Sequence, residues 1–248
     1  MASVQVRTES LPSPRWGFGA FLLVEAVLLT TAAFVSALLG SSSDGASIPT
    51  RHVLIGTITP TLVAVAVALL VTVVRGNGPV RDLSLQPRWD DVKTGLRFGA
   101  LGLVITTLGV AVWTRFVGED DAQSAIGALV ADRPLSVYAA LTVFFYLWLV
   151  GPICEEIIFR GLLWSAIERL QWKTMLWGRF AAFVISTAVF AVSHLEPLRT
   201  TLLLVIAIPI GLARLVTGRL LASIIAHQVN NFFPALAILL TALGVLQL

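Results

Sequence analysis

Long apolar segments dominate this sequence and constrain its fold more than any other feature. Seven such runs are separated by short polar stretches, and a helix of about 20 apolar residues spans the hydrocarbon core of a bilayer. They cover approximately residues 18–39, 53–74, 96–117, 135–164, 180–195, 200–216 and 220–243. Because backbone polar groups must be satisfied inside lipid, the sequence predicts an all-α, polytopic transmembrane helical bundle of about seven spans.

Composition agrees with a membrane protein and excludes other classes. Of the 248 residues, 57% are hydrophobic and 12% are charged, whereas soluble domains contain about 25% charged residues. The formal charge of +3 is too small to suggest a nucleic-acid partner, so we expect the lipid bilayer to be the partner surface. The single cysteine, Cys154, excludes an intramolecular disulfide and a thiolate-rich metal site.

The chain divides into three regions. We expect residues 1–17 to form a disordered cytoplasmic tail, residues 18–134 to hold spans one to three with their loops, and residues 135–248 to form a core. With seven spans, the basic loops fall on one side and the acidic loop 118–133 on the other. Positively charged loops stay in the cytoplasm, which predicts a cytoplasmic N-terminus. The Ala-, Val- and Leu-rich composition favours a bacterial plasma membrane.

Three ionisable groups interrupt the fourth span. The segment GPICEEIIFRG, residues 151–161, brings Glu155, Glu156 and Arg160 into apolar sequence. Each charge at bilayer depth costs roughly 3 kcal/mol, so these groups need partners or a wet cavity. Glu156 and Arg160 are four residues apart and can pair on one helical face. Glu155 points about 100° away and is left for chemistry, and Pro152 predicts a kink.

Histidines and asparagines add polar groups to the fifth and seventh spans. His227 and Asn231 are four residues apart and share a helical face. The pair Asn230–Asn231 is costly in lipid, and its structural interpretation is hydrogen bonding between helices. A carboxylate base, two imidazoles and an amide donor can activate water and stabilise an oxyanion. At 1.5 Å per residue, His194 would lie about 20 Å beyond Phe180, so span five must tilt or start deeper for His194 to reach Glu155.

Other uses of these groups stay open at the level of sequence. Ser223 shares a helical face with His227, which permits a Ser–His nucleophile, whereas Cys154 in apolar surroundings would be a poor thiolate. The polar cluster would also suit a proton relay in a transporter, or it would serve only packing in a non-catalytic scaffold. The lack of an internal repeat argues against a transporter, because many transporters contain one.

Three motifs resemble those of a known family. EEIIFRG matches EExxFR, FAVSH matches FxxxH and HQVNN matches HxxxN. They follow the order found in the CAAX-protease and bacteriocin-processing family of intramembrane endopeptidases, also called the Abi family, which includes the type II CAAX prenyl proteases. The resemblance covers about residues 151–232. It implies hydrolysis of a peptide or membrane-protein substrate, with residues 135–248 as the catalytic core.

The resemblance also implies a role for each motif residue. Glu155 and His194 would activate the attacking water, and His227 and Asn231 would bind the oxyanion. Glu156 and Arg160 would give structural support to this site. The sequence itself requires no cofactor.

The two histidines and one glutamate could also form a zinc site. Glu155, His194 and His227 would supply three ligands and leave an open position, and the family is commonly labelled as metalloproteases. There is no HExxH motif in the sequence, so the ligands would come from three separate spans. We favour metal-free glutamate–histidine chemistry and keep zinc as the alternative.

Overall fold

The computed structural model describes residues 13–39, 50–118, 124, 127 and 135–246. In these ranges the ordered elements are all helical, and seven helices are long and apolar enough to cross a membrane. These spans are Phe18–Leu39, Leu54–Arg75, Trp89–Val117, Val137–Glu168, Met175–Ser193, Thr200–Thr217 and Leu220–Ala242. The predicted all-α, seven-span bundle is therefore confirmed. The acidic loop 118–133 lies almost entirely outside the described residues.

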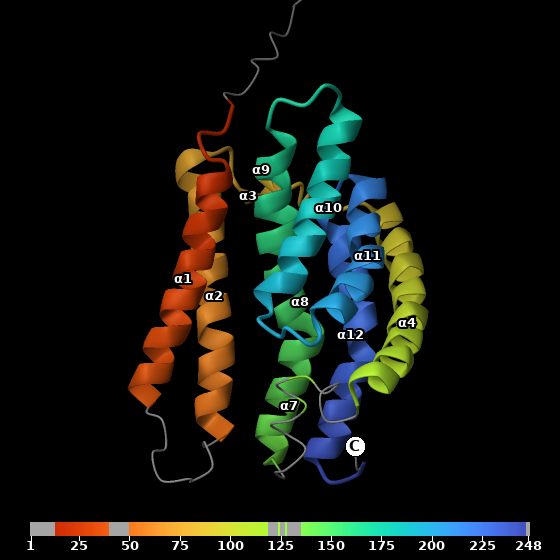
Figure 1. Cartoon of the computed structure of the whole chain (residues 1–248). Coiled ribbons are helices and arrows are strands. Elements are labelled where there is room, and N and C mark those ends of the chain that lie inside the picture. Colours follow the sequence, from red (N-terminus) through yellow and green to blue (C-terminus); the bar gives the residue numbers. More distant parts are fainter. Residues whose placement is uncertain (1–12, 40–49, 119–123, 125–126, 128–134, 247–248) are drawn as a thin grey trace, which may run out of the picture.

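The fourth span is divided by changes in helical register, so the elements outnumber the spans. They are α1 (Phe18–Leu39), α2 (Thr50–Arg75), α3 (Pro79–Asp82), α4 (Trp89–Val117), α7 (Val137–Phe145), η1 (Tyr146–Val150), α8 (Gly151–Glu155), η2 (Glu156–Leu163), α9 (Trp164–Glu168), α10 (Met175–Ser193), α11 (Thr200–Thr217) and α12 (Leu220–Ala242). Figure 1 shows α1 and α2 as a pair on one side, the fourth span at the centre, and α10, α11, α12 and α4 on the other side.

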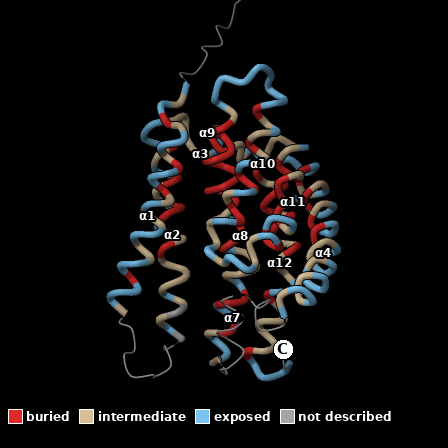
Figure 2. Tube along the Cα trace, in the orientation of Figure 1, coloured by how far each residue is buried: buried red, intermediate tan, exposed pale blue. Residues whose placement is uncertain are grey.

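Burial follows the pattern expected for helices surrounded by lipid. Buried residues gather along the central span and the faces turned toward it, whereas the outer faces of α1 and α4 are exposed (Figure 2). The exposed positions are apolar: Leu38 is 69% exposed and Phe116 is 81% exposed. A water-soluble bundle would place polar groups there, so these faces fit the hydrocarbon of a membrane.

The third span packs directly on the core, so regions 18–134 and 135–248 are not separate in space. α4 contacts both α11 and α12 along its length. A methyl group at Gly95 would come within 2.7 Å of the Ala222 carbonyl oxygen, and one at Gly99 within 2.6 Å of the Val229 side chain. Glycines at these positions let the two backbones approach closely, and that approach fixes α12 against the rest of the bundle.

The residues just before the first span are packed, which differs from the expected disordered tail. Residues 1–12 lie outside the described part, but Trp16 is only 5% exposed. Its indole N–H donates to the Asp82 carboxylate over 2.6 Å, and the Arg169 guanidinium lies 3.7 Å from the centre of the Trp16 ring. The polar sequence suggested a free tail. The packing could not be seen locally, because the partners of Trp16 lie 66 and 153 residues away along the chain.

Candidate active site

The central span changes register where the polar motif begins. The Gly151 N–H donates to the carbonyl of Tyr146, five residues earlier, and η1 and η2 are both π-helical segments that flank α8. Such segments are rare and often occur at functional sites. The sequence predicted a kink at Pro152. In the structure Pro152 lies in α8, and a π-helical segment precedes and follows this short helix.

Glu156 and Arg160 form a fully buried ion pair, as their four-residue spacing predicts. Arg160 Nη1 lies 3.1 Å from Glu156 Oε1, and both side chains are 0% exposed. The same oxygen lies 3.0 Å from Nδ1 of His227. The guanidinium of Arg160 also lies 4.3 Å from the centre of the Phe190 ring, a cation–π contact that gains strength where water is excluded. The pair thus joins the central span to α10 and α12.

Glu155 has a different environment from its neighbour. Its side chain is 30% exposed, and Oε2 lies 3.6 Å from Nε2 of His227. Within the described residues, no salt bridge joins Glu155 to an arginine. Two adjacent carboxylates in distinct surroundings can take distinct chemical roles. Glu156 is held by cationic and N–H donors, whereas Glu155 is accessible for proton transfer.

His227 lies between the two carboxylates and is 3% exposed. A carboxylate can only accept a hydrogen bond when ionised, so the contact at Nδ1 places a hydrogen on that nitrogen. Nε2 then faces Glu155. This contact between a span-four carboxylate and a span-seven imidazole brings residues 155 and 227 together, as the polar-site interpretation of the sequence required.

His194 directly follows α10 and lies beside the ring of Phe190, which in turn contacts His227. Figure 1 shows α10 crossing the bundle obliquely and ending near the level of α8, well above the lower ends of α7 and α12. The His194 ring lies 4.6 Å from the Phe190 ring, which lies 5.7 Å from the His227 ring. Nδ1 donates to the Phe190 carbonyl over 2.8 Å, so Nε2 carries the lone pair.

The two adjacent asparagines have different partners. Asn231 is half-buried and its Nδ2 donates to the Leu147 carbonyl over 3.2 Å. Asn230 is 2% exposed and its Oδ1 accepts from the Thr106 hydroxyl over 2.8 Å. Asn230 therefore links α12 to α4, while Asn231 faces the central span on the side of His227.

The alternative nucleophiles are placed unfavourably. The Ser223 hydroxyl is 0% exposed and donates to the Leu220 carbonyl over 3.0 Å, and both ring nitrogens of His227 face carboxylates instead. Cys154 is 4% exposed and belongs to the hydrophobic core. Neither side chain is arranged as an activated nucleophile.

The structure shows two of the three expected zinc ligands close together, Glu155 and His227, but no three-ligand group among the described residues. Glu155 Oε2 and His227 Nε2, at 3.6 Å, have the separation of two ligands about 2 Å from one zinc ion. No group of three His, Cys, Asp or Glu among the described residues is arranged to hold a metal. The described residues therefore do not fit the proposed three-ligand site, and we derive no step through a metal.

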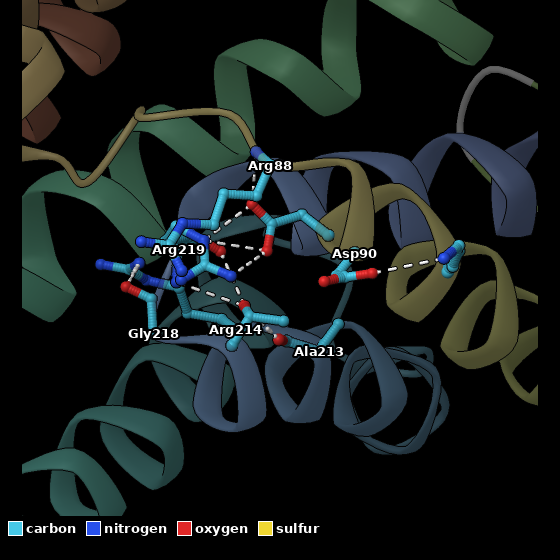
Figure 3. A network of polar contacts seen from close by, with 9 residues as sticks. Arg88, Asp90, Ala213, Arg214, Gly218 and Arg219 are labelled. Atoms are coloured by element: carbon cyan, nitrogen blue, oxygen red, sulfur yellow. Dashed lines mark hydrogen bonds and ion pairs between the residues drawn. The ribbon is translucent and has the colours of Figure 1, made fainter.

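Arg214 is a site-associated residue that the sequence did not reveal. It is one of the basic residues near the junction of spans six and seven, yet it is 1% exposed. Nε donates to the Arg160 carbonyl over 3.2 Å, and Nη1 donates to the carbonyl of Gly218 (Figure 3). Its side chain thus binds the backbone of the motif-bearing span, a long-range contact that no local pattern encodes.

Beside Arg214, a second arginine ties the same end of the bundle together. Arg219 contacts both carboxylate oxygens of Asp91, with Nη2 2.6 Å from Oδ1, and the Arg88 N–H also donates to this carboxylate (Figure 3). These hydrogen bonds to Asp91 raise the pKa of Arg219 above its usual value. These contacts connect the start of α4 to the loop between α11 and α12. The helix that follows this loop, α12, contains His227 and Asn231.

These features define a membrane-embedded helical bundle with a polar site between spans four, five and seven. Residues 137–233 match the family model described as Type II CAAX prenyl endopeptidase Rce1-like. The matched segment contains all three motifs and supports the resemblance to the CAAX-protease family that they predicted. No curated protein and no solved structure matches the chain.

Proposed function

We propose that this protein is an intramembrane endopeptidase in which Glu155 activates the attacking water. The observation that carries the proposal is the contrast between neighbouring carboxylates. Glu156 is fully buried against Arg160 and His227, whereas Glu155 is 30% exposed and contacts the far nitrogen of that imidazole. A carboxylate that is accessible and close to an imidazole has the access and the proton partner that a general base needs.

In the proposed reaction, the carboxylate of Glu155 removes a proton from water while the water oxygen bonds to the peptide carbonyl carbon. The carbonyl electron pair moves to oxygen and forms an oxyanion. On collapse, the C–N bond breaks and the proton passes from Glu155 to the departing amine. His194 supports the same water, because its Nδ1–H is held by the Phe190 carbonyl and Nε2 offers a lone pair.

The oxyanion is assigned to His227 and Asn231. Both lie on one face of α12, and Asn231 keeps one amide hydrogen beyond the one given to Leu147. His227 donates from Nε2 when its ring is doubly protonated, and the Glu156 carboxylate fixes the ring orientation through Nδ1. Donors held in place before the reaction stabilise developing charge at no further reorganisation cost.

The substrate is a peptide or a membrane protein that enters from the bilayer. The family's name refers to prenylated CAAX peptides. For a bacterial chain, we favour a peptide or a membrane-anchored protein that need not carry a prenyl group. We also propose that the end of the bundle bearing Arg169, Arg214 and Arg219 is cytoplasmic, because positive residues mark that side.

Purified protein in liposomes tests the proposal. We expect wild-type protein to cleave quenched-fluorescent membrane peptides, and Glu155→Gln to remove cleavage while keeping the helical content and thermal midpoint. The matched control is Glu25→Gln, which changes another membrane carboxylate outside the motifs and should leave cleavage intact. Wild-type rates in Glu155→Gln would refute the assignment, and proton-coupled uptake without cleavage would indicate the transporter alternative.

A further inference from the structure

A side chain bonds to the backbone in the middle of the central span. The Leu147 carbonyl accepts from Nδ2 of Asn231, 84 residues away in sequence, over 3.2 Å. Carbonyls inside a helix are normally occupied by the helix's own N–H groups, and within a membrane this rule is strict. An explanation is therefore needed for why the carbonyl of Leu147 is available to another helix.

Pro152 explains it. The Gly151 N–H is used by the Tyr146 carbonyl in the π register, so the usual four-residue donor to Leu147 is already engaged. In that register the next bond would join the N–H of residue 152 to the carbonyl of Leu147. Proline has no N–H, and the carbonyl is left without a helical donor. The π segment and the proline together create one vacant acceptor that faces α12.

A vacant carbonyl sets the orientation of the amide that binds it. The two ends of an asparagine amide are similar in shape, but only the nitrogen end can donate. Bonding to Leu147 therefore turns the nitrogen of Asn231 toward the central span and consumes one of its two hydrogens. The second hydrogen projects from the same nitrogen, on the helical face that Asn231 shares with His227.

We infer that Pro152 is a positioning residue for Asn231: by withholding a hydrogen from Leu147, it holds the amide with its nitrogen, and so its free N–H, toward the reacting carbonyl. This inference rests on the proposed function, in which Asn231 is an oxyanion donor. It assigns to the proline before the paired glutamates a task beyond bending the helix.

The kinetic test is Pro152→Ala, alone and together with Asn231→Ala. The new N–H competes for the Leu147 carbonyl, so turnover should fall at least about tenfold, as expected when an oxyanion donor is misplaced, with KM nearly unchanged. In the Asn231→Ala background the same change should have no further effect. The control is Pro60→Ala, which removes the proline inside α2 and should leave turnover unchanged.

Stability separates positioning from a structural role. Alanine is a far better helix former than proline, so Pro152→Ala should keep or raise the thermal midpoint while it lowers turnover. A lower midpoint together with a proportional loss of activity would mean that the proline serves only packing. Equal losses of turnover in the wild-type and Asn231→Ala backgrounds would also overturn the inference.

A measurement without catalysis tests the contact itself. The chain has three asparagines, Asn77, Asn230 and Asn231, so selective ¹⁵N-asparagine labelling gives three side-chain amide signals. Pro152→Ala should move the Asn231 signal and leave those of Asn77 and Asn230 in place. An unmoved Asn231 signal overturns the inference even if the protein is a protease. A moved signal in a protein that cleaves nothing would instead refute the proposed function.

Discussion

At the scale of single residues, adjacent side chains in this site differ more than their types suggest. Glu155 and Glu156 differ in exposure and partner, and so do Asn230 and Asn231. In each pair one residue is partly exposed, Glu155 and Asn231, and the other is buried, Glu156 and Asn230. Since neighbours in a helix point about 100° apart, each pair can supply one reactive group and one anchor, which is the division of roles that we propose.

The asparagine pair gives a prediction with an internal control. Asn231→Ala should lower turnover about a hundredfold and leave KM nearly unchanged, because an oxyanion donor acts on the transition state. Asn230→Ala should instead lower the free energy of unfolding by about 1–3 kcal/mol by leaving the Thr106 hydroxyl unpaired, with turnover nearly kept. Steady-state kinetics and thermal melts of both variants check this, and equal kinetic effects at the two positions would contradict it.

The buried ion pair predicts a loss of stability. Arg160→Ala leaves the Glu156 carboxylate buried without its cation, at a cost of about 3–5 kcal/mol. The double change Glu156→Gln with Arg160→Met should restore part of this, because glutamine can still accept from Nδ1 of His227 and methionine fills the volume. Thermal midpoints in detergent measure both effects. Full stability with lost activity in Arg160→Ala would move Arg160 into the catalytic set.

At the scale of elements, close approach of α4 and α12 holds the seventh span in place. Gly95→Ala puts a methyl group 2.7 Å from the Ala222 carbonyl oxygen, and a backbone atom cannot move aside alone. We expect a loss of about 1–3 kcal/mol, typical of overpacking. The control is Gly56→Ala in α2, where the added methyl meets nothing within 4 Å. A thermal midpoint for Gly95→Ala equal to that of the control would refute the packing argument.

Local sequence patterns predicted the helices, but they did not predict the contacts between helices. Apolar runs gave all seven spans, and the four-residue spacing gave the Glu156–Arg160 pair. The bond from His227 to Glu156 depends on how α12 lies against η2, and nothing within either segment encodes it. The π register of η1 escaped for a related reason: residues 146–150, YLWLV, carry no charge on any face, so hydrophobic periodicity gives no register there.

At the scale of the whole molecule, charged side chains hold the bundle together at one end. Arg169 packs on Trp16, Arg219 binds Asp91, and Arg214 binds the backbone of the central span. These contacts join segments that are far apart in the chain. The opposite ends of α1 and α2 have no such links among the described residues.

The Trp16 contacts predict that the segment before the first span contributes to stability. Trp16→Ala removes a buried aromatic ring and leaves the Asp82 carboxylate without its indole donor, so the free energy of unfolding should fall by about 3–5 kcal/mol. Cleavage per folded molecule should be unchanged, because the contact lies away from Glu155. Thermal melts and active-site titration separate the two quantities. Unchanged stability would mean that this packing is not maintained in the membrane.

The burial of Cys154 has a practical consequence. It is the one thiol in the sequence, it is 4% exposed, and it directly precedes Glu155. The wild-type chain is thus already a single-cysteine protein, and a maleimide reagent needs no engineered background. The rate at which the reagent alkylates Cys154 would report how often the central span opens. A substrate that keeps the bundle closed would lower this alkylation rate.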